Sequence, residues 1–254
     1  MTTEASSGES GALNLYRVRH TAVCDVLDPW AHGTVIRATT YPNYWDYNLV
    51  RVESDPEMTF EELESFADDA LGDLRHRRLD FEQIEVAERL RPDFEAAGWV
   101  TLRLVWMRHE EAVPDGDDVL VREVPYDDVI DLRRAWHDED FPDQDPLDYH
   151  ANAREVALRM GARVFAVERD GRAVAFAQLD GDDEAAEITQ VYVHPDERGS
   201  GMGTSLTKAA IEAAGDVGDL WICADDEDRP KELYARLGFR PALTTMEFTR
   251  MPRD

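Results

Sequence analysis

Three glycines that follow a predicted strand carry the clearest chemistry in this sequence. The strand Ala186–Val193 runs into a loop with glycine at positions 199, 201 and 203, where an amphipathic helix begins. The first N–H groups of a helix lack intrahelical partners and lie at the positive end of its dipole. Glycine lets an anion approach the backbone closely and permits positive φ angles. The segment therefore predicts a phosphate-binding site.

The spacing of these glycines excludes the two common nucleotide-binding loops. Residues 198–203 read Arg-Gly-Ser-Gly-Met-Gly, whereas a dinucleotide-binding turn needs G-x-G-x-x-G and would have Thr204 at its last place. A P-loop needs Gly-Lys-Ser/Thr after a longer glycine span, and this segment lacks it. The Arg-x-x-Gly-x-Gly pattern, preceded by Val191–Pro195, resembles the acetyl-CoA pyrophosphate loop of the GNAT N-acetyltransferase superfamily.

A second segment carries the same resemblance. Residues 228–239 read Asp-Arg-Pro-Lys-Glu-Leu-Tyr-Ala-Arg-Leu-Gly-Phe and are similar to the second GNAT signature, a short helix that ends in Leu-Tyr-x-x-Leu-Gly-Phe. Pro230 suits the first turn of this helix, and Gly238 stands where a left-handed residue ends one. The resemblance covers about residues 119–251, in the order that the family has.

The resemblance implies a mixed α/β (α+β) fold of two tandem GNAT-like domains, each with a bent, mostly antiparallel central sheet flanked by helices. Residues 119–254 are predicted to form the GNAT acetyltransferase domain, after a linker at 109–118 that breaks the apolar pattern. Residues 13–108 are predicted to form a degenerate GNAT-like domain, after a disordered tail at residues 1–12.

The degenerate domain is inferred from a similarity between two segments of the chain. Phe94–Trp99 aligns with Tyr234–Phe239, and a β-rich segment follows each of them. Carboxylates in Glu53–Glu57 stand where a glycine loop would lie, so this half is not expected to bind the coenzyme. Chance similarity of two α/β segments is the alternative explanation.

The resemblance assigns the coenzyme contacts to the signature strand and its loop. The predicted contacts are Val191, Tyr192, Val193, Arg198, Gly199, Ser200, Gly201, Met202, Gly203 and Thr204. Val191 and Val193 would donate backbone N–H groups to the acetyl oxygen, and Arg198 would add charge at the pyrophosphate. One departure is Glu227, where the family often has an asparagine that contacts the coenzyme, so that contact must be lost or replaced.

The resemblance also supplies two catalytic candidates. Tyr234 is the predicted general acid, which would hydrogen-bond the forming thiolate; a core tyrosine is the alternative. Glu187 is the predicted base, because strand alternation places it on one face with Thr189, Val191 and Val193. A salt-bridged or solvated glutamate at a strand edge is the alternative there.

The acceptor pocket of the family is walled by the region between the first two helices. Residues 136–145 are predicted to be an acidic loop there, in which Trp136, Asp138 and Phe141 bind an ammonium group through charge and cation–π contact. His137 is an alternative base. The competing interpretation is a solvated acidic loop in an acidic protein.

Composition limits the partners. The 254 residues carry 27 basic and 55 acidic side chains, a net charge of −28, which disfavours nucleic acid and anionic membrane surfaces. A compositional bias explains this charge better than one cationic substrate does, since only two of the basic residues are lysines. No apolar run approaches the about 20 residues of a membrane span. Two isolated cysteines, Cys24 and Cys223, predict free thiols, a cytoplasmic location and no metal site.

The sequence therefore predicts an acetyl-CoA-dependent N-acetyltransferase. A primary amine, either a small molecule or a peptide, would attack the thioester directly in a ternary complex. The alternative is a non-catalytic acyl-CoA-binding module with a regulatory or interaction role. An oligomer is compatible with either function.

Overall fold

The computed structural model describes residues 7–115, 119–142 and 145–252. The rest of the expected tail, part of the expected linker and residues 143–144 of the expected acidic loop lie outside the described residues. The first helix begins at Ser7, inside the stretch expected to be a tail. In the part of the chain that is described, no helix is both long and apolar enough to cross a membrane.

The chain divides into two compact units. Unit 1 comprises residues 1–106, 224–228 and 242–254, and unit 2 comprises residues 107–223 and 229–241. Strands β5, β10 and β11 therefore each contribute residues to both units. The domain boundaries expected from the sequence stay a prediction.

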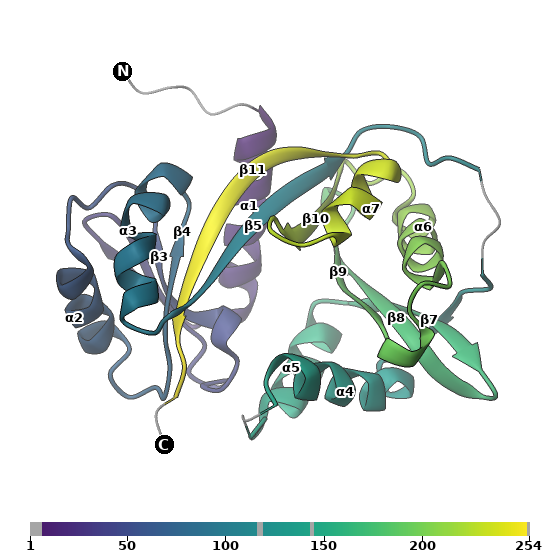
Figure 1. Ribbon diagram of the computed structural model, residues 1–254, viewed down its shortest axis with the longest axis horizontal. Coiled ribbons are helices and arrows are strands. Elements are labelled where there is room, and N and C mark those ends of the chain that lie inside the picture. The colour runs from purple at the N-terminus through teal and green to yellow at the C-terminus, as the bar shows by residue number, and fades with distance from the viewer. Residues whose placement is uncertain (1–6, 116–118, 143–144, 253–254) are drawn as a thin grey trace. The chain divides into compact units, whose positions relative to one another are not determined.

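Among the described residues, unit 1 contains the first three α-helices of the chain, most of its first five strands and most of its last strand. Its elements are α1 (Ser7–Val23), β1 (Val26–Trp30), β2 (Gly33–Arg37), β3 (Asn48–Val52), α2 (Phe60–Ala70), β4 (Arg77–Phe81), α3 (Ile84–Ala96), β5 (Val100–His109) and β11 (Phe239–Arg250). The strand order is β1-β2-β3-β4-β11-β5 (Figure 1). Strands β3 and β4 pair in parallel, with Val50 opposite Leu79.

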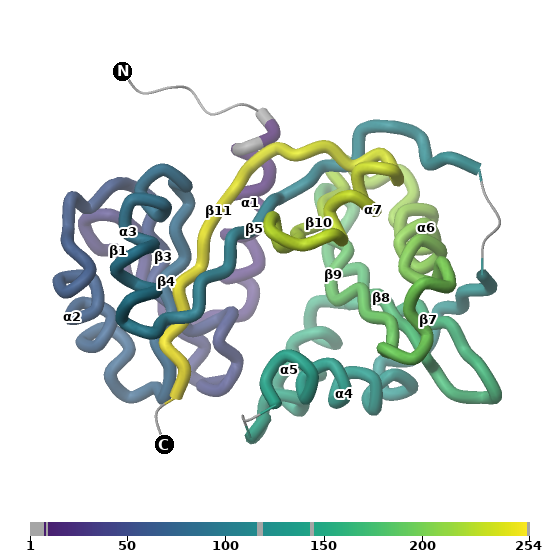
Figure 2. The backbone as a smooth tube through the Cα atoms, in the orientation of Figure 1, coloured from purple at the N-terminus to yellow at the C-terminus, as the bar shows by residue number. Residues whose placement is uncertain are grey.

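The last strand of the chain completes the sheet of unit 1. Figure 2 shows β11 in yellow beside β4, and the two strands pair antiparallel from Met246–Phe81 to Arg250–Arg77. The sequence pattern placed this strand with the C-terminal signatures and gave no sign of a partner in the N-terminal half. Pairing between distant segments depends on packing that periodicity does not encode.

The two faces of this sheet differ in chemistry. Helices α2 and α3 cover an apolar face whose core includes Leu79, Phe81, Phe94 and Phe248. The Phe94 and Phe248 rings stack with centroids 4.1 Å apart. Burial of such side chains stabilises the unit by about 1.5–3 kcal/mol each.

The opposite face of the sheet is charged and lies under α1. Arg78 is buried there and pairs with Asp80 at 2.8 Å, Asp46 at 2.6 Å and Glu247 at 2.5 Å. Tyr16 of α1 donates a hydrogen bond to Asp80. Burial raises the pKa of the Glu247 carboxyl. Removing the arginine would leave several carboxylates uncompensated, so α1 and this face depend on a complete ion-pair network.

Unit 2 is likewise built from a sheet with helices packed on it. Its elements are β6 (Arg122–Val124), α4 (Ile130–Asp140), α5 (Tyr149–Arg159), β7 (Arg163–Arg169), β8 (Arg172–Gly181), β9 (Ala185–Val193), α6 (Met202–Ala214), β10 (Asp219–Asp225) and α7 (Pro230–Arg236). The strand order is β10-β9-β8-β7-β6, antiparallel except for β9 and β10. Helices α4 and α5 cover one face, and α6 covers the other (Figure 1).

Two histidines are buried in unit 1. Burial lowers the pKa of His76 to about 4, although its Nε2 lies 2.8 Å from the carbonyl oxygen of Asn48. Burial likewise lowers the pKa of His20 to about 3. An unfolded histidine titrates near pH 6.5, so between that pH and the folded pKa the unfolded chain binds the additional proton.

We therefore expect the fold to lose stability as pH falls below about 6.5, with His76 contributing about 2 kcal/mol between pH 7 and pH 5. A His76→Gln variant keeps an amide N–H near the Asn48 carbonyl and cannot titrate. Urea unfolding at pH 7, 6 and 5 should show a shallower pH dependence for the variant than for the wild type. Parallel curves would contradict the role of His76.

Candidate functional site

The site begins where β9 and β10 separate. Their parallel ladder ends at the pair Ile188–Ile222, whereas β9 continues to Val193. On the other edge of β9, the His194 N–H donates to the Val174 carbonyl at 3.0 Å. Because N–H groups alternate in direction along an antiparallel strand, the Val193 N–H points away from β8, toward the opened edge. A ligand that offers carbonyl oxygens can pair there.

The backbone of β9 contains a bulge at Gln190, which has a φ of +54°. Thr189 pairs with Gln178 and Tyr192 pairs with Phe176, so Gln190 and Val191 stand opposite Ala177 alone. The insertion of one residue reverses the alternation of side chains beyond it. The expectation that Glu187 shares a face with Val191 and Val193 is therefore wrong. Glu187 instead shares its face with Tyr192.

The predicted loop after β9 has the backbone of an anion site. Gly199 and Gly201 have φ angles of +79° and +81°, and a Cβ at either position would meet no atom within 4 Å. Helix α6 begins at Met202 with Gly201 as its N-cap, and no side chain caps it. Met202 is buried, so its side chain belongs to the core and only its N–H can serve a ligand.

The equivalent helix of unit 1 is capped differently. Helix α2 follows the parallel strand β3, and Thr59 accepts a hydrogen bond from the Glu62 N–H. The Glu62 carboxylate in turn accepts from the Thr59 N–H at 2.9 Å. This capping box satisfies N–H groups of α2, whereas the start of α6 has no side-chain cap. Asp55, in the loop before α2, pairs with Arg89 at 2.7 Å and adds negative charge there.

Arg198 is tied to helix α4. Its guanidinium lies 2.7 Å from Glu139 and donates to the Val193 carbonyl at 3.1 Å. The Tyr192 hydroxyl also donates to Glu139, at 3.1 Å, and burial together with this carboxylate raises the pKa of Tyr192 to about 12. The side chain of Arg198 therefore orders the start of the loop, while it remains half exposed to solvent.

Helix α7 brings Tyr234 to the same corner of unit 2. A Cβ at Gly203 would lie 3.7 Å from Leu233 of α7 and 3.9 Å from Val193 of β9. The start of α6, the end of β9 and α7 thus meet around Gly203. Tyr234 is buried, and burial, with Cys223 nearby, raises the pKa of its phenol well above the usual value. The hydroxyl is therefore a protonated hydrogen-bond donor throughout the neutral range.

Glu187 lies in a buried polar row. It is 4% exposed and pairs across the ladder with Asp180, which is also buried. Asp180 accepts hydrogen bonds from Gln178 at 2.8 Å and from Thr189 at 3.0 Å. This row faces the side of the sheet that α4 and α5 cover.

Arg133 of α4 organises the same face. It donates to Gln178 at 2.8 Å and to Gln190, and its guanidinium carbon lies 3.9 Å from the centre of the Tyr126 ring. The bulge at Gln190 is thereby held by a buried cation. Sequence reasoning did not select Arg133 or Gln190, because their contact joins residues far apart in the chain.

The region predicted to be an acidic loop is largely helical. Helix α4 runs through Asp140, so residues 136–140 belong to it, and the expectation of a loop from residue 136 is wrong. The apolar side of the helix explains this, because Trp136 stacks on Tyr192 with ring centroids 5.9 Å apart. Asp138 is directed to solvent, with 76% of its side chain exposed.

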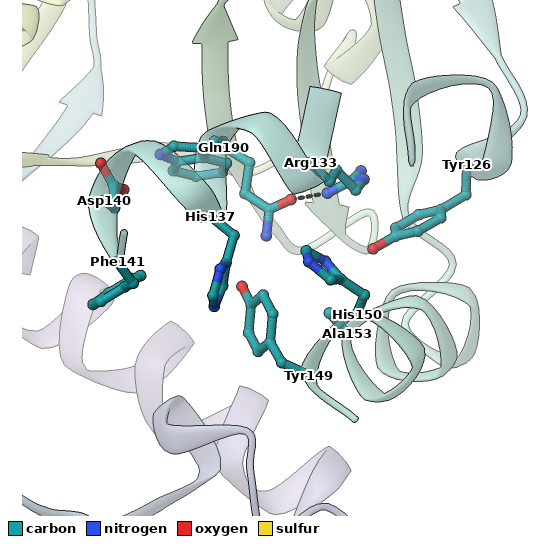
Figure 3. A pocket seen from close by; sticks show the side chains of 10 residues that line it. Tyr126, Arg133, His137, Asp140, Phe141, Tyr149, His150, Ala153 and Gln190 are labelled. Atoms are coloured by element: carbon teal, nitrogen blue, oxygen red, sulfur yellow. Dashed lines mark hydrogen bonds between the residues drawn. The ribbon is translucent and has the colours of Figure 1, made fainter. Parts of the chain in front are cut away.

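A cavity of about 80 Å³ lies between α4, α5 and the bulge (Figure 3). Trp136 and Phe141, two of the three predicted substrate contacts, line it, and Asp138 is not among its lining residues. The residues that sequence reasoning missed here are Tyr126, Arg133, Asp140, Tyr149, His150, Ala153 and Gln190. The Tyr-His pair at the start of α5 was the available signal, but nothing in its spacing relates it to α4.

Glu227, which stands where the family often has an asparagine, forms an ion pair with Arg91. Its carboxylate receives two hydrogen bonds from Arg91, at 2.8 and 3.1 Å, inside unit 1. Arg91 lowers the pKa of Glu227. The Glu227 carboxylate is therefore already bound by the Arg91 guanidinium.

Comparison with known proteins identifies the family. Residues 126–239 match the acetyltransferase (GNAT) family. An uncharacterized N-acetyltransferase of Methanocaldococcus jannaschii is 35% identical over 98 residues, which cover 34% of this chain and 43% of that protein. The chain spans about half the length of the curated relatives it matches. Residues 126–239 form a GNAT domain, as the two signatures predicted.

Solved structures show the same fold over more of the chain. A functionally unknown conserved protein of Staphylococcus epidermidis superposes with a TM-score of 0.69 at 15% identity, covering 91% of this chain and 95% of that one. A tandem GNAT protein from the clavulanic acid biosynthesis pathway superposes with a TM-score of 0.50 at 15% identity, covering 80% and 76%. These likenesses confirm the predicted mixed α/β fold with two GNAT-like halves.

The loop glycines yield a test of backbone geometry. Gly201→Ala forces an L-residue into the left-handed region and should lower the free energy of unfolding by about 1–2 kcal/mol. Gly203→Ala is the matched control, because that glycine is helical and a methyl group there makes ordinary contacts. Urea unfolding should show no loss for Gly203→Ala. Equal effects of the two substitutions would contradict the assigned loop conformation.

Proposed function

We propose that the chain is an acetyl-CoA-dependent N-acetyltransferase that acts on a primary amine. One observation supports this most: the opened end of β9, the glycine-lined start of α6 and the helix that carries Tyr234 meet around Gly203. These three parts are what a thioester coenzyme requires. The family uses acetyl-CoA generally, and the residues present fit that molecule.

The coenzyme is proposed to bind along the opened edge of β9 and over the loop. Backbone N–H groups of Gly201, Met202, Gly203 and Thr204 would bind the pyrophosphate at the start of α6, with Gly199 and Ser200 in the turn. The absence of a side-chain cap on α6 supports this assignment. Arg198 would contribute charge from the side, since Glu139 already holds its guanidinium.

The reaction is proposed to proceed by direct attack. The lone pair of the neutral amine attacks the thioester carbonyl carbon, and the N–H groups of Val191 and Val193 stabilise the developing oxyanion. The carbon–sulfur bond then breaks and the thiolate leaves, and the nitrogen loses one proton, which the thiolate takes up, as the amide forms. Tyr234 donates a hydrogen bond to that sulfur, and its raised pKa keeps the donor proton in place.

The N-terminal half is proposed to bind no coenzyme. Its capping box at Thr59 and Glu62 occupies the helix N-terminus that would hold a phosphate. Binding should therefore occur at one site per chain. A cytoplasmic location, a small-molecule or peptide acceptor and a possible oligomer remain predictions from the sequence.

A non-catalytic acyl-CoA-binding module is the second candidate. Glu227 supports it, because the position that often contacts the coenzyme in the family is here paired with Arg91. Tight coenzyme binding without thiol release over a broad amine panel would favour this candidate over the transferase.

Titration calorimetry with acetyl-CoA tests the coenzyme site. The wild type should bind one equivalent, and Gly201→Glu should abolish binding, because it places a carboxylate on the proposed phosphate site. Gly171→Glu is the matched control, since that glycine also has a positive φ, +74°, with open space around it. Loss of binding in the control, or retained binding in Gly201→Glu, would argue against the loop.

Tyr234→Phe tests the donor to the leaving group. Phenylalanine preserves the buried ring, so affinity for acetyl-CoA should stay unchanged while kcat falls about 10²-fold. Thiol release at saturating coenzyme, measured from pH 6 to 9, gives kcat directly. An unchanged kcat over this range would show that the hydroxyl takes no part.

A further inference from the structure

The cavity between α4 and α5 contains a cluster of ionisable rings that the proposed coenzyme site does not use. His137 comes from α4, and Tyr149 and His150 begin α5. Their ring centroids form a near-equilateral triangle, with 5.5 Å between His137 and Tyr149 and 5.3 Å from His150 to each of them. Figure 3 shows His137 and Tyr149 directed toward one another across this space.

His137 has a buried nitrogen that lacks a partner. Its side chain is 10% exposed, and Nδ1 makes no hydrogen bond to any residue that the structure describes. The nearest carboxylate oxygen, on Asp138, is 3.8 Å from Nδ1, which is beyond hydrogen-bond distance. A buried ring nitrogen is costly to leave unsatisfied. His137 also lines the cavity, so its imidazole can meet a polar ligand bound there.

The surroundings of His137 suit a cationic ligand that becomes neutral. Trp136, Phe141 and Tyr149 provide aromatic faces for an ammonium group. Asp140 lines the same cavity, and desolvation there raises the pKa of its carboxyl. Burial lowers the pKa of His150, and the neighbouring His137 lowers it further.

The charged and titratable groups around His137 and His150 come from two helices. From α4 they are Arg133, Arg134, Asp138 and Asp140, and from α5 the group beside them is Tyr149. From β9, the neutral amide of Gln190 completes the wall. Arg133 is already bonded to Gln178 and Gln190, which leaves the imidazoles and Asp140 as the groups that can exchange a proton with a ligand.

We propose that this cavity binds a small primary amine with an alkyl or aromatic body, and that His137 is the base that deprotonates it. The proposal rests on the acetyltransferase function proposed above. In the step, one N–H proton of the ammonium passes to the imidazole of His137. The freed lone pair attacks the thioester carbon and the carbon–sulfur bond breaks. The nitrogen gives a second proton to the departing thiolate as the amide forms, and His137 later releases its own proton to solvent.

The size of the cavity favours a small molecule over a peptide. A volume of about 80 Å³ admits a short chain or the end of a ring, and the wall residues are mostly aromatic. Glu187, the base predicted from the sequence, does not line the cavity. His137 therefore has the more direct access to an amine bound there.

The test compares His137→Asn, Glu187→Gln and a control, His32→Asn, which lies in unit 1. Asparagine at position 137 keeps an acceptor near Nδ1 that cannot take up a proton. The readout is thiol release from acetyl-CoA with phenethylamine, with propylamine and with a lysine-containing peptide, from pH 6 to 10. Calorimetry with acetyl-CoA alone is run on every variant.

We expect His137→Asn to lower kcat for phenethylamine at pH 7 by at least about 10²-fold, with KM and coenzyme affinity changed less than about 3-fold. The lost rate should return as the pH approaches the pKa of the free amine, because the base is then unnecessary. His32→Asn should match the wild type in every readout. The peptide should be a poor acceptor.

Other outcomes overturn the proposal in distinguishable ways. An unchanged pH profile in His137→Asn, with the rate lost in Glu187→Gln, would assign the base to Glu187. Efficient acetylation of the peptide alone would overturn the small-amine assignment. A wild-type chain that binds acetyl-CoA but releases no thiol with any acceptor would overturn the transferase function and this inference with it. Absence of coenzyme binding would overturn the coenzyme site itself.

Discussion

The backbone of β9 enters the left-handed region at Gln190, and much of the site depends on that one residue. A side chain with positive φ costs roughly 1–2 kcal/mol, which the buried hydrogen bond from Arg133 offsets. The resulting bulge turns Tyr192 toward α4 and Val193 toward α6. It also lies just beyond the pair at which β9 separates from β10. One local distortion therefore lies between the cavity beside α4 and the opened edge of β9.

Both halves of the chain contain a strand, a helix and a parallel strand in that order, β3-α2-β4 in unit 1 and β9-α6-β10 in unit 2. The N-termini of the two helices are capped differently. In unit 2, glycines leave the first N–H groups of α6 without a side-chain cap. In unit 1, Thr59 and Glu62 close the start of α2 with their own side chains. The same peptide dipole is thus available to a ligand in one half and internally satisfied in the other. The difference follows from side-chain chemistry rather than topology.

In each unit, one buried arginine binds several polar side chains. The buried arginines Arg78 and Arg133 each hold several polar groups that would be unstable in a core without a cation. In unit 1 the result is a charged sheet face closed by α1. In unit 2 the result is a polar row beside the cavity lined by His137, whose Nδ1 makes no hydrogen bond to a described residue. The net acidity of the chain therefore coexists with interiors that are locally neutralised.

The sequence by itself determined the family, the glycine loop, the capping of α2 and the helix that carries Tyr234. These features are local, because glycine backbone freedom, caps and helix ends depend on a few neighbouring residues. Only the tertiary structure decided the bulge at Gln190, the helical state of residues 136–140, the pairing of β11 with β4 and the meeting of His137 with His150. Each of these depends on packing between segments far apart in the chain, and periodicity carries no record of such contacts. A single inserted residue in β9 was enough to reverse the faces that alternation had assigned.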